Sequence, residues 1–432
     1  MIRIDDRHYA RGEVEERTAR HAEQARLSDR PGARFAACFT ETVDWLSLFF
    51  AVRAAGGSLL PLHPSTPPAA ARRMARDGGC QYLFHNSLTP EEIAPPPVPE
   101  TGHPLPGHLI QMSSGTTGAP KCIARTWGDI ERELDSYVAH FREAEGMTPV
   151  IACPTTHSYG LICGLLAGLR RGAEPVVLNT ANPKYVLKTV RKTERPLLYA
   201  SPVILHALAK LMPAGERIHA AMTSGTLLPA PWFERIRSKV DHMFQQYGCS
   251  EAGVIAVNPD MQAPNDLGLV LPHHRLATGT PDVPAEIVLA GPGGDIHTRD
   301  LAYRRPDGML VFVSRMDDTI NVSGLNVYPK DVEDVVMSLP GVTDAVAFRK
   351  ADPFAGERVG LAFSAGPEVS AQAIRDWCRA HLAAHQQPGD IVRMDALPRM
   401  ANGKISRREL AERHAAPPPA PIPGQPRTGA GA

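Results

Sequence analysis

The chain reads Ser113-Ser114-Gly115-Thr116-Thr117-Gly118-Ala119-Pro120-Lys121 directly after the short apolar run 109–112. Small and hydroxyl-bearing residues around Gly115 leave backbone amides exposed and permit positive φ, which suits a loop that wraps a phosphate chain. A kinase-type P-loop requires G-x-x-x-x-G-K-[ST], with lysine next to the second glycine. Here Ala119 and Pro120 intervene and Cys122 follows the lysine. The pattern therefore predicts a phosphate-binding loop of another kind.

Length and composition narrow the class of protein. At 432 residues the chain is long enough for two or three domains. Lysine plus arginine and aspartate plus glutamate are equal at 46 each, so no overall field favours nucleic acid or an acidic membrane. The seven cysteines are scattered without C-x-x-C spacing, which disfavours a disulfide framework and a zinc site. The first residues begin no apolar run, so we expect a cytoplasmic protein without membrane or nucleic-acid partners.

The order of elements predicts an α/β fold. A strand over 34–39, a helix over 43–55 and a strand over 58–62 give a β-α-β rhythm. Proline-rich residues 90–106 predict an extended connector, and the pattern after it predicts a helix over 127–141. Further predicted elements are strands over 150–153, 175–178 and 197–200, then a small α+β unit with helices over 332–339 and 371–385 around a strand over 345–348. We expect a large N-terminal domain over 1–316, a small C-terminal domain over 317–413 and a disordered tail over 414–432.

Five later motifs carry groups that suit a nucleotide. Ser224-Gly225 ends a predicted strand, and Tyr247-Gly248-Cys249-Ser250-Glu251 ends another. A carboxylate beside a phosphate loop suits a magnesium ion between them, which makes Glu251 the candidate metal ligand. Asp300, in Thr298-Arg299-Asp300, is able to accept two hydrogen bonds from ribose hydroxyls, and Arg315 carries a planar fork that is able to bridge ribose and phosphate. The last motif is Pro398-Arg399-Met400-Ala401-Asn402-Gly403-Lys404.

Taken together, these motifs resemble the adenylate-forming superfamily of acyl-CoA synthetases, luciferase and nonribosomal peptide synthetase adenylation domains, over about residues 51–410. The resemblance implies an ATP-dependent acid–thiol ligase that forms an acyl-adenylate, releases pyrophosphate and transfers the acyl group to coenzyme A or phosphopantetheine. It implies that Lys404 stabilises charge in the first step, that Ser250 contacts the α-phosphate and that Tyr247 lies near the adenine. The loop residues 113–118 and Lys121 would hold ATP with magnesium. The small domain would rotate about Asp317.

The resemblance implies a small carboxylic acid as the substrate, and His157-Ser158-Tyr159 is the candidate segment that contacts it. No carboxylate is present there to pair with an ammonium group, so an amino acid is disfavoured. The stretch resembles coumarate-CoA ligases and hydroxybenzoate-adenylating enzymes, in which Ser158 would hydrogen-bond a ring hydroxyl. A medium-chain fatty acid is the alternative, because apolar residues 160–165 would also suit an aliphatic slot. The alternative for His157 is a purely structural role. For the whole chain, a further alternative is an inactive homologue that serves as a scaffold.

Two features depart from the family pattern. Arg299 stands where the superfamily usually has glycine, which would narrow the entrance while leaving Asp300 in place. The phosphate loop also comes early in the chain, so we expect a shortened N-terminal domain, with consequences for a homodimer or for the wall of the substrate channel. We expect no fused carrier domain, so the acceptor thiol would come from coenzyme A or from a separate acyl carrier protein.

Overall fold

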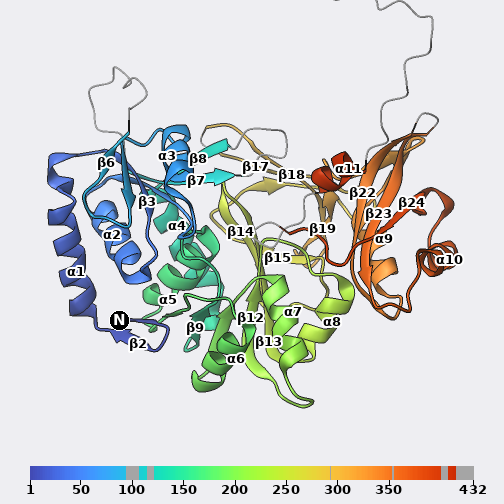
Figure 1. Cartoon of the computed structure of the whole chain (residues 1–432), viewed down its shortest axis with the longest axis horizontal. Helices are drawn as coiled ribbons and strands as arrows, with labels where there is room; N and C mark the ends of the chain where they lie inside the picture. The colour runs from blue at the N-terminus through green and yellow to red at the C-terminus, as the bar shows by residue number, and fades with distance from the viewer. Residues whose placement is uncertain (94–106, 114–120, 292, 353–354, 400–406, 415–432) are drawn as a thin grey trace, which may run out of the picture. The chain divides into compact units, whose positions relative to one another are not determined.

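Figure 1 shows the computed structural model of the chain, which describes residues 1–93, 107–113, 121–291, 293–352, 355–399 and 407–414. The chain divides into two compact units, Met1–Asp317 and Asp318–Ala432, one residue later than the predicted boundary. The predicted proline-rich connector lies outside the described residues from residue 94 on. The predicted tail lies outside them from residue 415 on. No helix in the described part of the chain is long and apolar enough to cross a lipid bilayer.

A six-stranded sheet forms the first part of the larger unit, in the order β6-β5-β3-β4-β7-β8. Strands β3, β4, β5 and β7 are parallel, and β8 returns antiparallel to β7. Helices α2 and α3 make the crossovers that parallel strands require, as the β-α-β rhythm predicted. The bounds are β3 (Arg34–Cys38), α2 (Thr42–Ala54), β4 (Ser58–Pro61), α3 (Pro68–Asp77), β5 (Tyr82–His85), β6 (Glu91–Glu92), β7 (His108–Ser113) and β8 (Lys121–Thr126).

A thirteen-stranded sheet forms the rest of the larger unit, in the order β16-β17-β18-β19-β15-β14-β13-β12-β11-β9-β10-β1-β2. Strands β9 to β13 are parallel to one another, and the sheet is antiparallel from the β13–β14 pair onward. Its strands are β1 (Ile2–Ile4), β2 (Arg7–Tyr9), β9 (Thr148–Ile151), β10 (Val176–Val177), β11 (Pro196–Tyr199), β12 (Ile218–Thr223), β13 (Val240–Cys249), β14 (Gly253–Asn258), β15 (Asp266–Val270), β16 (Leu276–Ala277), β17 (Ala285–Leu289), β18 (Ile296–Arg304) and β19 (Leu310–Arg315).

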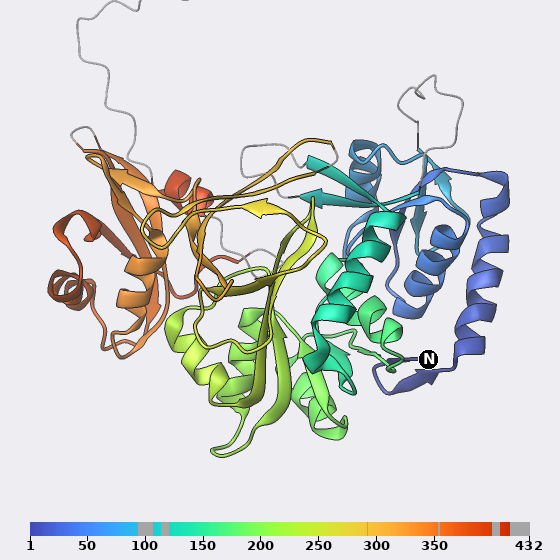
Figure 2. The same cartoon turned by 180° about the vertical axis from the view of Figure 1, so that it is seen from behind.

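Helices cover these sheets and separate the parallel strands. They are α1 (Arg11–Gln24), η1 (Leu27–Asp29), α4 (Trp127–His140), η2 (Arg142–Ala144), the π-helix η3 (Tyr159–Leu166), α5 (Ala167–Arg170), α6 (Pro183–Lys192), α7 (Pro202–Leu211) and α8 (Ala230–Arg237). Helix α4 contacts both β8 and β14, and Figure 2 shows it beside strands of both sheets. One cluster of buried apolar side chains joins α2, α4, η3 and both sheets, including Phe35, Phe49, Tyr137, Leu161 and Tyr199. The large unit therefore has a continuous core that fixes its strand ends relative to one another.

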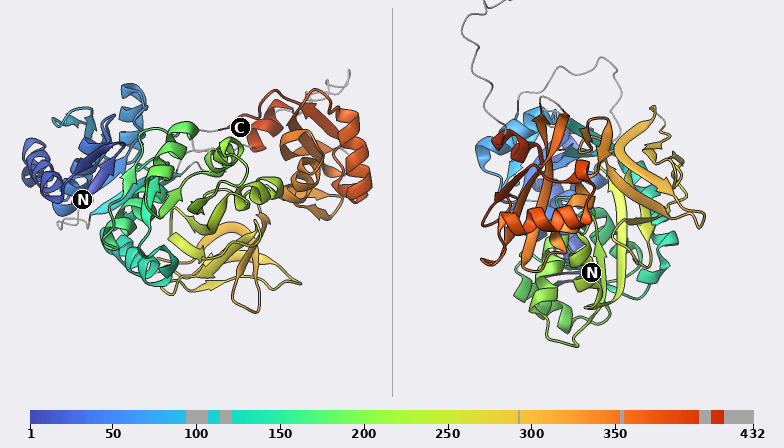
Figure 3. Two further views of the ribbon diagram at one scale, coloured as in Figure 1. Left: turned by 90° about the horizontal axis from the view of Figure 1, so that it is seen from below. Right: turned by 90° about the vertical axis from the view of Figure 1, so that its right-hand side faces the viewer.

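The smaller unit is an α+β domain built on a long antiparallel pair of strands, as predicted (Figure 3). Phe348 of β22 packs with Leu410 of α11 in one buried cluster. The helix predicted over 371–385 ends at His381, because Leu382 is extended, and a single 3₁₀ turn follows. The elements are β20 (Ile320–Val322), β21 (Leu325–Val327), α9 (Pro329–Met337), β22 (Val342–Asp352), β23 (Gly356–Ala365), α10 (Ala371–His381), η4 (Ala384–Gln386), β24 (Asp390–Arg393) and α11 (Arg407–Arg413).

Candidate active site

The predicted phosphate loop connects the two strands of an antiparallel hairpin. Ser113 ends β7 and Lys121 begins β8, and the two residues are paired across the hairpin. The loop residues Ser114, Gly115, Thr116, Thr117 and Gly118 lie outside the described residues, as does Lys404. The roles predicted for them therefore stay predictions, and the site is built from the strands around the loop.

The turn that carries Ser250 and Glu251 joins β13 to β14. Gly248 lies at a bulge in this pair, and a Cβ atom there would lie 2.2 Å from the carbonyl oxygen of Gly253, so only glycine fits. Gly253 has a φ of +76°, which brings the chain back into β14. Within the turn Ser250 is half-buried and Glu251 is exposed. The local backbone thus presents the predicted metal ligand at the surface of the strand end.

The structure brings Ser224 and Gly225 to the same edge of the sheet. Thr223 of β12 pairs with Gln245 of β13, so the residues that follow them lie side by side. The hydroxyl of Ser224 donates to the carbonyl oxygen of Gln246 at 3.1 Å. Gly225 has a φ of +88°, a conformation that favours glycine. These contacts place the two predicted nucleotide-binding segments next to each other.

Tyr247, Asp300 and Arg315 form one polar group at this edge. Asp300 and Arg315 are register partners on β18 and β19, and their ion pair measures 3.1 Å between Oδ1 and Nη1. The Tyr247 hydroxyl donates to Asp300 Oδ2 at 2.6 Å. Burial and the Asp300 carboxylate raise the pKa of the Tyr247 phenol well above its ordinary value, so it stays a hydrogen-bond donor. The Asp300 side chain is only 9% exposed, yet both of its oxygens are oriented by protein donors.

Arg299 adopts the backbone conformation that explains why glycine is usual at its position. Its φ is +63°, and its backbone N–H donates to Glu286 Oε1 at 2.8 Å. The exposed guanidinium group turns toward Asp317 and donates to Oδ1 at 2.8 Å. Arg315 Nη2 also lies 3.8 Å from Asp317 Oδ2. The predicted hinge residue, which ends the larger unit, is therefore bound by two arginines.

The three residues of the predicted acid-binding segment have different surroundings. Tyr159 begins the π-helix η3, and its hydroxyl donates to the carbonyl oxygen of Met222 at 2.6 Å. Burial raises the pKa of this phenol well above its ordinary value. Ser158 is half-buried and donates from Oγ to Gln111 Oε1 at 2.7 Å, while His157 is exposed. Tyr159 thus ties the segment to the end of β12. Ser158 is connected to the strand that precedes the phosphate loop through Gln111, which lies two residues before Ser113 at the end of β7.

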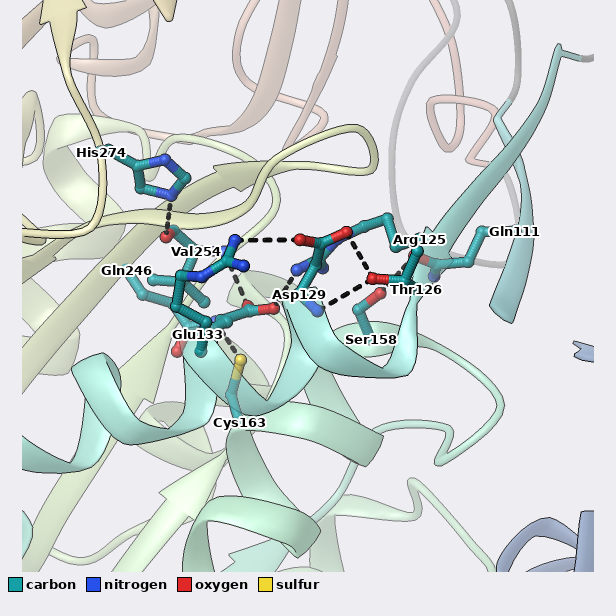
Figure 4. Close-up of polar contacts among 11 residues, drawn as sticks. Gln111, Arg125, Thr126, Asp129, Glu133, Ser158, Cys163, Gln246, Val254 and His274 are labelled. Atoms are coloured by element: carbon teal, nitrogen blue, oxygen red, sulfur yellow. Dashed lines mark hydrogen bonds and ion pairs between the residues drawn. The ribbon is translucent and has the colours of Figure 1, made fainter. Parts of the chain in front are cut away.

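Sequence reasoning missed a buried ion pair close to these segments. Arg125 of β8 contacts Glu133 of α4, and their side chains are 7% and 2% exposed. Figure 4 shows this pair beside Val254, which follows the Ser250–Glu251 turn. A signal was present, because Glu133 falls on the buried face of α4 together with Ile130, Leu134 and Tyr137. A carboxylate on an apolar helix face needs a buried partner.

Both units match known protein families. Residues 3–294 match the family described as AMP-binding enzyme, and residues 331–404 match the AMP-binding enzyme C-terminal domain. The chain belongs to the AMP-binding enzyme family. The predicted adenylate-forming superfamily, the α/β fold and the activity class, an AMP-forming acid–thiol ligase, are confirmed. The family is ATP-dependent, with coenzyme A or a carrier-protein thiol as acceptor.

Curated relatives of the enzyme include several ligases. It is 34% identical over 414 residues to a 3,4-dihydroxybenzoate–[aryl-carrier protein] ligase of Bacillus anthracis, covering 95% of this chain and 98% of that protein. It is 29% identical to an oxalate–CoA ligase of Arabidopsis thaliana, over 72% and 68% of the two chains. Among solved structures, an O-succinylbenzoate coenzyme A synthetase of Bacillus subtilis in complex with AMP matches with a TM-score of 0.80 at 23% identity, over 95% and 94% of the two chains. That likeness shows the shared fold.

Proposed function

We propose that the enzyme activates a hydroxylated benzoate and transfers it to the phosphopantetheine thiol of an aryl-carrier protein. The observation that carries this proposal is the end-to-end match to the 3,4-dihydroxybenzoate–[aryl-carrier protein] ligase. In the first step a carboxylate oxygen attacks the α-phosphorus of ATP and pyrophosphate leaves. In the second step the thiol attacks the acyl carbon, a thioester forms and AMP leaves.

The hydrogen bond of Ser158 supports a hydroxylated ring. Because Ser158 Oγ donates its proton to Gln111 Oε1, the lone pairs of the serine oxygen are what remain for the acid. A phenolic hydroxyl is a donor and matches these lone pairs, whereas a methoxy group has no proton to give. An unpaired polar group in a closed pocket costs about 1–3 kcal/mol, so the deoxy or methoxy acid should lose about tenfold to a hundredfold.

The group around Asp300 supports a nucleotide site of the predicted kind. Arg315 and Tyr247 hold the Asp300 carboxylate in one orientation, in which it would accept hydrogen bonds from the ribose hydroxyls. Ser224, Gly225 and Ser250 lie at the same sheet edge and would face the phosphates. Lys404 would approach the α-phosphate and stabilise the charge that develops there.

A magnesium ion fits this donor set as a companion of ATP. Within the described ranges, no group of three or more His, Cys, Asp or Glu side chains is placed to hold a metal ion. Magnesium takes one or two carboxylates and completes its shell with phosphate oxygens and water. The exposed Glu251 carboxylate would supply the protein ligand. The ion would neutralise charge on the pyrophosphate leaving group.

Coenzyme A is the second candidate acceptor, because curated relatives include CoA ligases such as 2-succinylbenzoate–CoA ligase. The test gives the purified enzyme ATP, magnesium and an equimolar mixture of 3,4-dihydroxybenzoate, octanoate and phenylalanine, with either a holo aryl-carrier protein or coenzyme A. Mass spectrometry of the thioesters identifies acid and acceptor together. We expect the dihydroxybenzoyl group on the carrier protein. Octanoyl thioester as the main product would refute the proposed acid, and faster transfer to coenzyme A would refute the proposed acceptor.

A further inference from the structure

The buried ion pair of Arg125 and Glu133 belongs to none of the predicted ATP motifs, yet burying its two charges costs free energy of desolvation. Arg125 Nη2 lies 2.5 Å from Glu133 Oε2 in the core of the larger unit (Figure 4). Removing two charges from water is unfavourable unless their geometry and additional hydrogen bonds compensate, so a buried ion pair is weak evidence for stability alone. The other contacts of Glu133 indicate a different use.

Glu133 and His274 hold the two peptide groups on either side of the Val254 Cα atom. The backbone N–H of Val254 donates to Glu133 Oε1 at 2.8 Å. His274 Nε2 lies 2.9 Å from the carbonyl oxygen of Val254. Burial lowers the pKa of His274, so the ring is neutral and its proton lies on Nε2, facing that carbonyl. Val254 is therefore fixed three residues after Glu251.

Gly253 brings the turn into direct contact with the ion pair. At a φ of +76°, a Cβ atom on this residue would lie 2.5 Å from Glu133 Oε2 and 2.6 Å from Arg125 Nη1. Either contact is too short for a real side chain, so the backbone runs against both charged groups. The ion pair thus packs against the turn at Gly253, two residues from Glu251.

Arg125 connects this support to the phosphate-loop hairpin. It lies on β8, which begins at Lys121, and its neighbour Thr126 caps helix α4 by accepting from the Asp129 N–H at 3.1 Å. Glu133 lies on that helix, which contacts both β8 and β14. Lys121 and Glu251 are therefore linked through strand β8, helix α4 and two buried charges.

We propose that Arg125 and Glu133 are positioning residues for the first half-reaction: they set the distance between the strand that follows the phosphate loop and the turn that carries Ser250 and Glu251. This inference rests on the proposed function only in assigning Lys121, Ser250 and Glu251 to ATP and magnesium. The second half-reaction, attack of a thiol on an existing acyl-adenylate, needs neither pyrophosphate nor its metal ion. Loss of the pair should therefore affect the two half-reactions unequally.

The test replaces both charges together, because a single change would leave one buried charge without its partner. The variant Arg125→Met/Glu133→Gln retains an amide oxygen for the Val254 N–H. Adenylate formation is measured by pyrophosphate release in single turnovers, and thioester formation is measured from a supplied acyl-adenylate, with whichever acid the wild-type enzyme activates. A magnesium titration of the first step accompanies both assays.

We expect adenylate formation to fall at least tenfold with a raised magnesium requirement, while thioester formation stays within about twofold of the wild-type rate. The control Arg191→Met/Glu216→Gln removes an exposed two-bond ion pair of the same unit and should change neither rate. Equal losses in both half-reactions, or no loss in either, would overturn the positioning role. A wild-type enzyme that activates only non-aromatic acids would refute the proposed substrate and leave this test intact.

Discussion

Replacing Tyr247 with phenylalanine tests the polar group that we assign to the ribose. The change removes one hydrogen bond, from the phenol to Asp300 Oδ2, and leaves the ion pair with Arg315 in place. A hydrogen bond to a charged group contributes about 1.5–3 kcal/mol, and because Tyr247 is half-buried we take the lower end, ~1.5 kcal/mol. The unfolding entropy of a unit ending at Asp317 is roughly 0.7 kcal/mol per kelvin, so Tm should fall by about 2 °C.

The same substitution should have a larger measurable effect on KM for ATP than on Tm. Without the hydrogen bond from Tyr247, the Asp300 carboxylate is less firmly oriented toward the ribose, and loss of ~1.4 kcal/mol of binding raises KM for ATP about tenfold. The kcat value should change by less than threefold, because the ribose contact is equally present before and during the reaction. Acid-dependent pyrophosphate exchange at varied ATP concentration measures both constants.

Tyr303→Phe is the matched control for this prediction. Tyr303 lies on β18 with Asp300 and is likewise half-buried, and no hydrogen bond of its hydroxyl is recorded among the described residues. This variant should keep the wild-type KM for ATP and the wild-type Tm. If Tyr247→Phe also keeps both values, the phenol does not orient Asp300 and the reasoning is refuted.

Four further changes have separable outcomes. Glu251→Gln should raise the magnesium concentration needed for half-maximal adenylate formation, and an unchanged titration would remove Glu251 from the metal site. Lys404→Ala should abolish adenylate formation and spare thioester formation from supplied adenylate, whereas equal losses would contradict its assignment to the first step. Ser158→Ala should reduce the preference for hydroxylated over methoxylated benzoates about tenfold or more without changing KM for ATP. Burial and neighbouring His274 lower the pKa of His273 to about 4, from an unfolded value near 6.5. The contribution of the neutral ring to the free energy of unfolding is therefore complete above about pH 6.5 and is lost as the pH falls toward 4. In urea unfolding, the free energy of unfolding of His273→Gln should decline less steeply between about pH 7 and 5 than that of the wild type.

Local patterns in the sequence located most of the fold. Helix α2 was predicted because its apolar residues lie at helical spacing and end at two glycines, and the structure confirms it within one residue at each end. The π-helix η3 was missed, because a pattern with i to i+5 hydrogen bonds has no distinct apolar period. The short hairpin of β1 and β2 was also missed, since its order depends on pairing with β10, far along the chain.

The candidate site was predictable as a set of motifs and less so as a set of contacts. Tyr247 was expected near an adenine, but its bond to Asp300 joins residues 53 positions apart and no local pattern contains it. The role of Ser158 was proposed without its partner Gln111, which lies on a strand of the other sheet. Glu133 was missed although it lies on the apolar face of helix α4, and its partner Arg125 was missed because the pairing depends on the packing of that helix against β8.

The most direct test of the account is acid-dependent exchange of labelled pyrophosphate into ATP, with 3,4-dihydroxybenzoate, benzoate, octanoate and phenylalanine supplied one at a time. This exchange requires an acyl-adenylate, so it reports the proposed first step without any acceptor. We predict rapid exchange with 3,4-dihydroxybenzoate, at least tenfold slower exchange with benzoate, and background rates with octanoate and phenylalanine. Exchange fastest with octanoate or phenylalanine, or no exchange above background with any of the four acids, would contradict the account.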